Sequence, residues 1–266
     1  MKNEFMEYVE RLIPLVRQAG AAILTFYTPR SDECVIAYKQ DDASSPVTQA
    51  DLAAEAIIIA GLQDLAPSFP IVAEEAGRVV KCEEKGDSEY FWLVDPLDGT
   101  REFIQRNGEF TVNIALIKQG MPVFGVVFAP ALDVLYAGGV GLPAFCERGM
   151  QRQRIRCRRL GRAAIVVSSR SHNDETALQN FLHTHSVEKT LTVGSSLKFC
   201  LVAEGTADLY PRLGKTMEWD TAAAHAVLNA AGGEVVTLEG LPLRYGKKGF
   251  ANPFFVAHGL KEEGIK

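Results

Sequence analysis

Two aspartates at the end of an apolar stretch are the residues of this sequence whose types and spacing best suit chemistry. Residues 91–94 have the aromatic and β-branched character of a buried strand, and Asp95-Pro96-Leu97-Asp98-Gly99-Thr100 follows. Pro96 and Gly99 are expected to stop the strand and force a turn. Because two ionised carboxylates so close together repel, Asp95 and Asp98 predict a hard cation such as Mg²⁺ between them, with backbone carbonyls as further ligands. The alternative is an aspartate-rich turn that binds nothing.

A second apolar segment ends in carboxylates in the same way. Residues 69–73 are a short strand candidate that runs directly into Glu74 and Glu75. If this strand neighbours residues 91–94 in one sheet, Glu74 joins Asp95 and Asp98 at the same sheet edge. Adjacent glutamates are also common in solvated turns, so both interpretations stay open.

Asp51 has two interpretations as well. Residues 51–65 predict a helix, and Thr48 is a suitable N-cap. Asp51 then stands at the third helical position, where a carboxylate bonds back to the cap and complements the positive end of the helix. The functional alternative is that Asp51 faces a cleft and binds a metal or orients a water.

Polar residues follow predicted strand ends in the second half of the sequence, at residues 169–172, 194–198 and 218–220. Ligands of α/β sheets gather at the carboxyl ends of strands. The turn at Gly194 to Ser196 is expected to open a helix whose N–H groups suit a phosphate, and Lys198 adds a cation. Asp220 is either a site residue or a first-turn residue stabilised by the helix dipole.

The helices and strands that must position these residues are expected to differ in type between the first and second halves of the chain. Apolar spacing predicts a long helix over residues 5–26, in which Pro14 favours a kink. Period-two alternation with regular turns predicts an antiparallel meander over residues 110–146, so the first half is expected to have helices packed on an antiparallel sheet. Strand and helix then alternate, which predicts an α/β half with a parallel or mixed sheet. We expect an α+β domain at residues 1–160 and an α/β domain at residues 161–266.

Residues 148–162 carry seven arginines near the expected domain junction. Arg152, Arg154, Arg156 and Arg158 alternate, so a strand would place them on one face. Charged residues on an edge strand discourage unwanted pairing, and a solvated edge is the simplest interpretation. The alternative is a patch that recruits phosphates or an anionic membrane surface.

Composition and charge exclude several classes of protein. Hydrophobic residues make up 47% and charged residues 23% of the 266 positions, as in ordinary globular proteins. The formal charge of −5 does not attract nucleic acid. The five cysteines are widely spaced and suggest neither a disulfide framework nor a zinc site. With no leader-like or membrane-spanning segment, the sequence predicts a soluble cytoplasmic protein, and peripheral attachment to the cytoplasmic face of the inner membrane stays open.

The order of these motifs resembles a known family. Glu74-Glu75, then Asp95 to Thr100, then Trp219-Asp220 before a small-residue helix ending in Gly232-Gly233 closely resembles the inositol monophosphatase superfamily of Mg²⁺-dependent, lithium-sensitive phosphatases. Residues 92–104, 107–113 and 194–200 look like the bacterial CysQ-type 3′(2′),5′-bisphosphate nucleotidases. The resemblance covers nearly the whole chain and implies the layered α-β-α-β-α sugar-phosphatase-like fold.

The resemblance also implies roles for individual residues. The implied metal ligands, for two or three Mg²⁺ ions, are Glu74, Asp95, the Leu97 carbonyl, Asp98 and Asp220, and Asp51 matches a carboxylate that serves a weakly held metal. Gly99 and Thr100 match the turn that receives the scissile phosphate, and Thr100 with Asp51 and Glu74 matches the group that positions the attacking water. The residues that match the binding site for the nucleoside and its second phosphate are His172, Ser195, Lys198 and Arg212, and Asp220 is also expected to contact substrate.

The leading hypothesis is a phosphatase that removes the 3′-phosphate of adenosine 3′,5′-bisphosphate, giving AMP and phosphate and supporting sulfate assimilation. The sulfated relative of this nucleotide is a candidate second substrate. An inositol or sugar phosphate monophosphatase of the same superfamily is the alternative, and a non-catalytic nucleotide-binding regulator is a third. The expected partner is a small nucleotide bisphosphate, with no nucleic acid and no integral membrane segment, and the sequence does not decide between monomer and homodimer.

Overall fold

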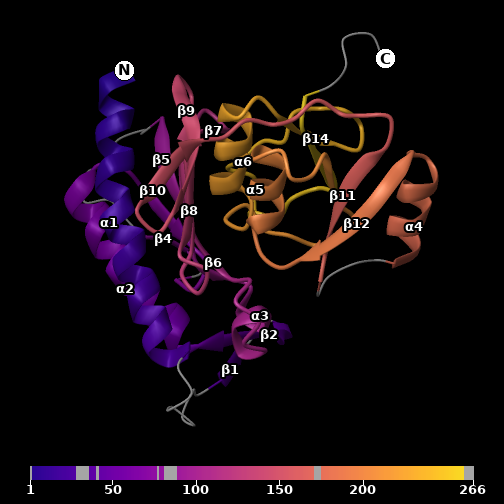
Figure 1. Cartoon of the computed structure of the whole chain (residues 1–266). Helices are drawn as coiled ribbons and strands as arrows, with labels where there is room; N and C mark the ends of the chain where they lie inside the picture. The colour runs from indigo at the N-terminus through magenta and orange to yellow at the C-terminus, as the bar shows by residue number, and fades with distance from the viewer. Residues whose placement is uncertain are drawn as a thin grey trace.

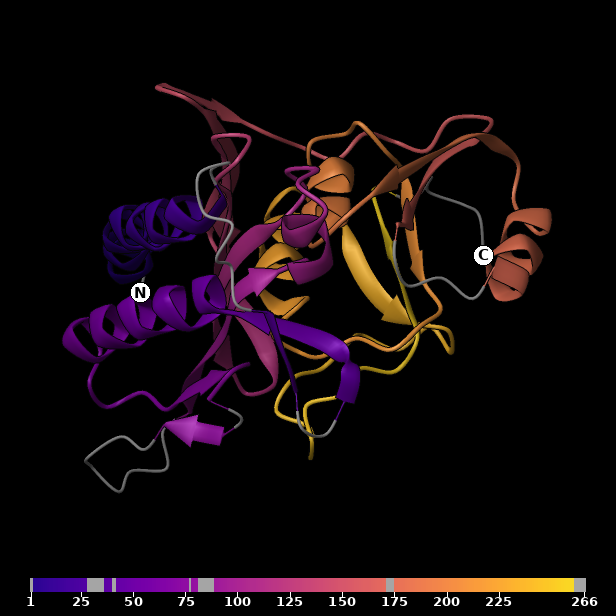
Figure 2. The same ribbon diagram turned by 90° about the horizontal axis from the view of Figure 1, so that it is seen from below.

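The protein is built of five alternating layers of helix and sheet. The computed structural model describes residues 2–27, 36–39, 42–76, 78–80, 89–170 and 175–260. From one side to the other, the layers are a helix pair, a large sheet, a second helix pair, a smaller sheet and one outer helix (Figures 1 and 2). This arrangement confirms the layered α-β-α-β-α fold that the resemblance implies.

The large sheet has eight strands among the described residues, in the order β10-β9-β8-β7-β6-β5-β3-β4. These strands are β3 Ile71–Ala73, β4 Arg78–Val80, β5 Tyr90–Asp98, β6 Thr111–Lys118, β7 Met121–Ala129, β8 Val134–Gly139, β9 Leu142–Arg148 and β10 Gln151–Arg154. Neighbouring strands are antiparallel except β3 and β5, which run parallel with Ala73 opposite Val94. The carboxyl ends of β3 and β5 therefore meet at one edge, as the sequence predicted.

Two long helices cover one face of this sheet, α1 Lys2–Tyr27 and α2 Gln49–Leu65. The buried side of α1 carries Val9, Leu12 and Val16 at helical spacing, and they pack in one cluster with apolar residues of α2 and the sheet. Strands β1 Ile36–Lys39 and β2 Asp42–Thr48 form a separate hairpin before α2. No helix in the described residues is long and apolar enough to cross a membrane.

The smaller sheet has the strand order β12-β11-β13-β15-β14 and is mixed, as predicted. Its strands are β11 Ala164–Ser169, β12 Val187–Val193, β13 Leu209–Arg212, β14 Glu234–Thr237 and β15 Phe255–His258. Strand β11 is parallel to β12 and β13, whereas β15 is antiparallel to β13 and β14. Helix α4 Glu175–His183 packs on the outer face through Phe181 and Leu182.

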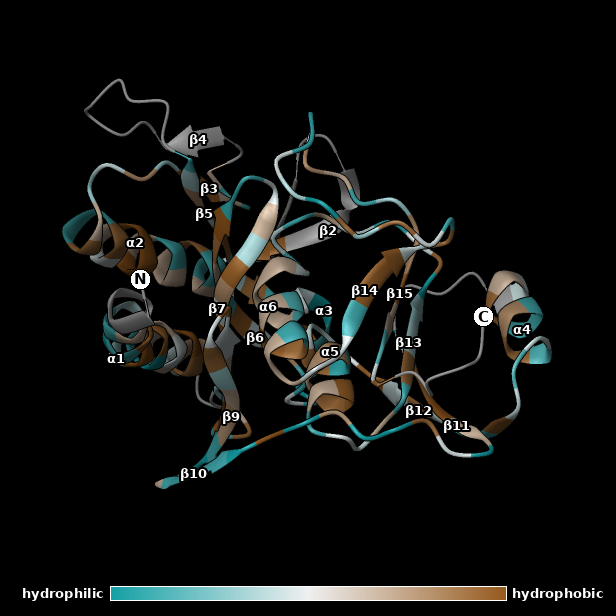
Figure 3. Cartoon of the chain, turned by 90° about the horizontal axis from the view of Figure 1, so that it is seen from above, coloured by the Kyte–Doolittle hydropathy of each residue, from teal (hydrophilic) through white to brown (hydrophobic). Residues whose placement is uncertain are grey.

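Helices α5 Leu197–Ala203 and α6 Ala222–Ala230 lie between the two sheets (Figure 3). One hydrophobic cluster joins side chains of the large sheet, both helices and the smaller sheet, including Val127, Phe199, Val227 and Phe255. The approach of α6 to β7 is close, because a Cβ added at Gly125 would lie 2.3 Å from the Ala223 carbonyl oxygen. The core thus crosses residue 160, and the division into domains 1–160 and 161–266 stays a prediction.

Strand β5 differs from its prediction at Pro96. The sequence predicted that Pro96 and Gly99 would stop the ladder, but β5 continues to Asp98. Pairing with β6 is interrupted after Asp95, which lies opposite Asn113, and resumes where Asp98 lies opposite Thr111. Proline has no N–H to donate, so the ladder skips this position as an irregularity instead of ending there.

One helix matches its prediction, and another begins later than predicted. Helix α1 continues through Pro14 from Lys2 to Tyr27. Helix α6 begins only at Ala222, with Thr221 at its N-cap, so Asp220 precedes the helix and is not a first-turn residue. Its end is as predicted, because Gly232 at φ +96° follows directly after the C-cap Ala231.

The arginine-rich segment forms an exposed sheet edge, as the simplest interpretation predicted. Strand β10 is the terminal strand, and its four residues are all exposed. The expected alternation over four arginines is interrupted, because the strand ends at Arg154. Beyond it, Arg158 is half-buried and pairs with Asp208 at 2.5 Å.

Candidate active site

A cleft of about 300 Å³ lies where the two halves of the chain meet. The predicted residues that line it are Glu74, Asp95, Leu97, Asp98, Gly99, Thr100, Ser195, Lys198, Arg212 and Asp220. The structure therefore brings together nearly all of the predicted site. His172 lies outside the described residues, and its predicted role stays a prediction.

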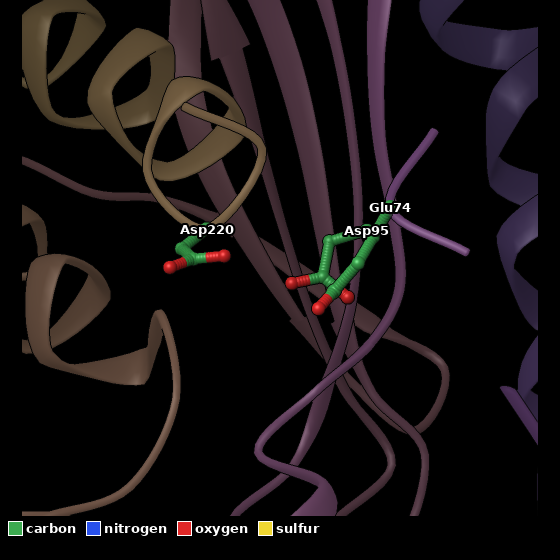
Figure 4. Close-up of side chains that lie close together, drawn as sticks. All are labelled: Glu74, Asp95 and Asp220. Carbon is green, nitrogen blue, oxygen red and sulfur yellow. The ribbon is translucent and has the colours of Figure 1, made fainter. Parts of the chain in front are cut away.

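Three carboxylates converge on one point of the cleft. One oxygen from each of Glu74, Asp95 and Asp220 lies within 4.8 Å of the others, and Figure 4 shows the three side chains pointing toward a common space. Glu74 follows β3, Asp95 belongs to β5 and Asp220 precedes α6. The backbone N–H of Leu97 donates to Asp95 Oδ1 at 3.0 Å, and that of Met217 donates to Asp220 Oδ2 at 2.8 Å. Backbone bonds thus fix the direction in which two of the acids point.

Burial and the repulsion of neighbouring carboxylates raise the pKa values of Asp95, Asp98 and Asp220. Burial is the largest cause for Asp95 and Asp220, whose pKa values lie well above the usual range, and the neighbouring carboxylates raise them further. The pKa of Asp98 is raised to about 6, again mainly by burial, although the nearby Lys198 ammonium opposes the shift. Such a cluster favours a positively charged ligand, and its oxygen donors are those that divalent hard cations prefer. The donor set therefore fits a metal of the Mg²⁺ type.

The structure confirms Asp51 as a capping residue, and its role toward a metal or a water stays a prediction, because Asp51 is not among the residues that line the cleft. Its Oδ2 accepts hydrogen bonds from the Thr48 N–H at 2.8 Å and the Thr48 hydroxyl at 2.6 Å, which completes the capping box of α2. Its other oxygen, Oδ1, accepts from the Thr100 hydroxyl at 3.3 Å. Burial raises the pKa of Asp51 to about 6, while the bonds from Thr48 oppose this and the Glu74 charge adds to it. Asp51 thus caps its helix and contacts Thr100, which lines the cleft.

The turn after Asp98 needs a glycine. Gly99 has φ +92°, and a Cβ there would lie 3.2 Å from the Glu109 carbonyl oxygen. Helix α3 Thr100–Ile104 begins immediately after this turn. The Thr100 hydroxyl lies 3.3 Å from the carbonyl oxygen of Leu97 as well as from Asp51. This short turn places a hydroxyl and the Leu97 carbonyl next to the carboxylates.

Two buried basic side chains of the second half of the chain, here called the basic wall, line the same cleft. Lys198 and Arg212 are only 5% and 6% exposed, and both line the cleft. Lys198 donates through Nζ to the carbonyl oxygens of Ser195 and Val193, and Arg212 donates to that of Lys215 at 2.6 Å. Burial lowers the pKa of Lys198 to about 8, although Asp98 counteracts the shift. Two buried cations that bond to neutral carbonyls suit an anionic ligand.

Two polar residues, one lining the cleft and one next to Asp98, were not among the predicted site residues. Asn113, on the buried strand β6, accepts from the Ser196 hydroxyl at 2.7 Å and lies 3.5 Å from Asp98 Oδ2. Glu102, on α3, is 4% exposed and also lines the cleft. Asn113 could have been recognised from the sequence, because it is a polar residue within an otherwise apolar strand. Glu102 could not be recognised as a site residue in this way, because an acidic residue is ordinary in the first turn of a helix.

Comparison with known proteins gives the class that this fold and this cleft define. The sequence profile of the Inositol monophosphatase family matches residues 6–263. The chain therefore belongs to the inositol monophosphatase family, a family of metal-dependent phosphatases.

More particular relatives lie within this family. A Salmonella typhimurium protein named 3′(2′),5′-bisphosphate nucleotidase CysQ is 48% identical over 93% of this chain and 98% of its own length. The protein of the same name from Escherichia coli K12 is 47% identical with the same coverage. The crystal structure of CysQ from Bacteroides thetaiotaomicron, described as a bacterial member of the inositol monophosphatase family, superposes with a TM-score of 0.80. It is 38% identical and covers 97% of this chain and 99% of that one.

Proposed function

We propose that this protein is a 3′(2′),5′-bisphosphate nucleotidase that removes the 3′-phosphate of adenosine 3′,5′-bisphosphate to give AMP. The observation that carries the proposal is that the buried cations Lys198 and Arg212 line the same cleft as the carboxylates. A substrate with one phosphate at each wall would use both sets of charges. The names of the relatives support the same activity, and the sulfated relative of the nucleotide is proposed as a second substrate.

The proposed cofactor is Mg²⁺, as two or three ions. Residues that would hold the ions are Glu74, Asp95, Asp98, Asp220 and the Leu97 carbonyl, with Asp51 at a weaker position. When bound, Mg²⁺ polarises the phosphoryl oxygens, lowers the pKa of a water and stabilises the leaving oxygen.

The chain itself supplies orientation and proton handling. The Thr100 hydroxyl can accept a hydrogen bond from the attacking water while it donates its own proton to Asp51 Oδ1, 3.3 Å away. Gly99 leaves the turn open for the scissile phosphate. Direct in-line attack by a water that Thr100 and Asp51 orient is proposed, without a phospho-enzyme.

On the basic wall, Lys198 and Arg212 are proposed to bind the phosphate that does not react, and Ser195 and His172 to contact the nucleoside. Binding energy from this remote group orients the reacting phosphate against the carboxylates. The enzyme is proposed to act on this small nucleotide in the cytoplasm without nucleic acid.

A substrate panel with Mg²⁺ tests the proposal. Adenosine 3′,5′-bisphosphate should have a kcat/KM at least about 10-fold above those of inositol 1-phosphate and fructose 1,6-bisphosphate, because it is proposed to use both the second-phosphate contacts and the nucleoside contacts. Preference for inositol 1-phosphate would replace the proposal with an inositol or sugar phosphatase. Binding of the nucleotide without phosphate release would indicate a non-catalytic regulator.

A further inference from the structure

Glu109 and Arg170 form an ion pair at the junction of the two halves, and neither residue has a role in the site described above. Glu109 lies between α3 and β6, and Arg170 directly follows β11. Arg170 donates through Nε and Nη2 to the two carboxylate oxygens of Glu109 at 3.0 and 2.9 Å. Nη2 also donates to the Thr192 carbonyl oxygen at 3.1 Å. A two-point contact of this kind fixes the direction of the carboxylate as well as its place.

The Glu109 carboxylate also accepts a hydrogen bond from the turn at residues 194–196, which precedes Lys198. Gly194 donates its N–H to Glu109 Oε2 at 2.8 Å. The backbone of Glu109 is equally close, since its carbonyl oxygen would lie 2.8 Å from a Cβ at Gly194 and 3.2 Å from a Cβ at Gly99. Glu109 therefore lies close to two glycine turns of the site, at Gly99 and at Gly194.

Ser195, the next residue, has an unfavourable backbone conformation. Its φ is +49°, in the left-handed region that residues other than glycine seldom adopt. Such a conformation persists only where neighbouring contacts fix it. On one side the Gly194 N–H is held by Glu109, and on the other the Leu197 N–H lies 3.4 Å from the Ser195 hydroxyl and Lys198 donates to the Ser195 carbonyl.

The turn has a second and separate attachment to the first half. Ser196 donates to Asn113 at 2.7 Å, and Asn113 lies 3.5 Å from the Asp98 carboxylate. Removing the Glu109 carboxylate would therefore release Gly194 and Ser195 but leave Ser196 attached beside Asp98. The reacting centre and the remote binding group are held by different contacts.

We propose that Glu109 is a positioning residue, oriented by Arg170, that sets the Gly194–Ser195 backbone and thereby the selectivity for substrates with a second phosphate. The inference rests on the proposed nucleotidase function. The Glu109–Arg170 pair then affects substrate binding and leaves the chemical step unchanged.

Kinetics of Glu109→Ala, Arg170→Ala and the double variant test the proposal. In Glu109→Ala we expect KM for adenosine 3′,5′-bisphosphate to rise about 10-fold, with kcat and the KM for 3′-AMP within about 3-fold of the parent. Arg170→Ala should raise KM about 3-fold, and the double variant should match Glu109→Ala because the two residues act as one unit. Glu109→Gln keeps an acceptor for the Gly194 N–H and should recover part of the loss.

Amide hydrogen exchange gives a readout that does not depend on the substrate. Exchange over residues 190–197 should be faster in Glu109→Ala than in the parent, while melting temperatures stay similar. Arg152→Ala is the matched control, because Arg152 and Arg170 are both 40% exposed and each pairs with a glutamate. The control should change neither KM nor this exchange.

Three results would overturn the inference: unchanged KM and exchange in Glu109→Ala, equal losses on both substrates, or a double variant with additive losses. Failure of the proposed function is distinguishable, because the parent itself would then not cleave the bisphosphate. In that case faster exchange at Gly194 would still support the positioning contact, and the claim of selectivity would be overturned.

Discussion

The acidic and basic walls of the cleft have opposite charges, and in both of them burial disfavours the charged form of the side chains. Carboxylates of the first wall come from strand ends and loops, and burial raises the pKa values of Asp95, Asp98 and Asp220. On the second wall, burial lowers the pKa of Lys198 to about 8. Burial therefore disfavours the charged form of both sets of side chains, while the Asp98–Lys198 and Asp220–Arg212 attractions oppose that effect. A ligand that combines cations with phosphates would satisfy both walls at once.

The walls differ in how their side chains are held. Backbone N–H groups of Leu97 and Met217 aim the carboxylates of Asp95 and Asp220. On the basic wall, Lys198 and Arg212 instead donate to backbone carbonyls. The acidic wall thus exists as a preformed set of ligands, whereas the basic wall must exchange carbonyl contacts for phosphate contacts. We expect changes on the first wall to affect the chemistry and changes on the second to affect substrate choice.

The largest effect should follow from removing one charge of the acidic wall. Asp95→Asn or Asp98→Asn should lower kcat by at least about 10³-fold, equivalent to the several kcal/mol that metal ions contribute to phosphoryl transfer. The metal-free fold should be at least as stable, because like-charge repulsion falls in both variants. In Asp95→Asn, the amide oxygen of the new side chain can still accept from the Leu97 N–H.

Turnover and thermal unfolding with and without Mg²⁺ check this prediction. The rise in melting temperature caused by Mg²⁺ should be smaller in the variants than in the parent. Turnover within 10-fold of the parent would remove these aspartates from the metal site.

A smaller and more selective effect should follow on the basic wall. Lys198→Ala or Arg212→Ala should lower kcat/KM for adenosine 3′,5′-bisphosphate about 10–100-fold, the equivalent of one charge-assisted hydrogen bond. Hydrolysis of 3′-AMP should change far less, because it lacks the remote phosphate. Parallel assays of both substrates measure the ratio, and Arg212→Lys is the conservative control. Equal losses would mean that these residues act at the scissile phosphate or in the fold.

The smallest effect concerns the stability of the metal-free protein at different pH values. The pKa values of Asp51 and Asp98 are about 6 when folded, against an ordinary value of 3.8, so the folded protein binds more protons than the unfolded chain. The free energy of unfolding should therefore fall as pH rises from about 4 to 7, by on the order of 2 kcal/mol for each carboxyl. Excess Mg²⁺ should remove this fall, since the ion binds the ionised acids more tightly at higher pH.

Denaturant unfolding at about pH 5 and about pH 7.5, with a chelator or with Mg²⁺, measures the change. The difference between the parent and Asp98→Asn isolates one group from the rest of the chain. A parent that loses no more stability than Asp98→Asn over this range would contradict the raised pKa of Asp98.

Much of the fold could be predicted from the sequence, because the spacing of apolar residues and the capping residues match the helices and strands that form. Helical spacing in α1, the Thr48 cap of α2 and the alternation in β6 to β9 all identified elements that the structure contains. The errors came from proline and from helix starts. Pro96 removes one ladder bond without ending β5, and the start of α6 depends on tertiary contacts near Thr221 that no local pattern reveals.

The acidic site was more predictable than the contacts behind it. Motif order and resemblance identified Glu74, Asp95 and Asp220, and the parallel pairing of β3 and β5 explains why the first two meet. The contact of Asp51 with the Thr100 hydroxyl could not be predicted, because the two residues are far apart in the sequence. The Glu109–Arg170 pair was invisible, because its members are far apart in sequence and each is an ordinary surface residue type.

The place of Asp220 before α6 has a consequence for the order in which the protein assembles. Asp95 and Glu74 are synthesised early, but the third carboxylate joins them only after α6 has docked on β7, where Gly125 meets Ala223. A chain that has folded only its first half offers an incomplete set of ligands and would compete weakly for divalent ions. Affinity for the metal is therefore a property of the finished molecule, and ion binding favours completion of folding.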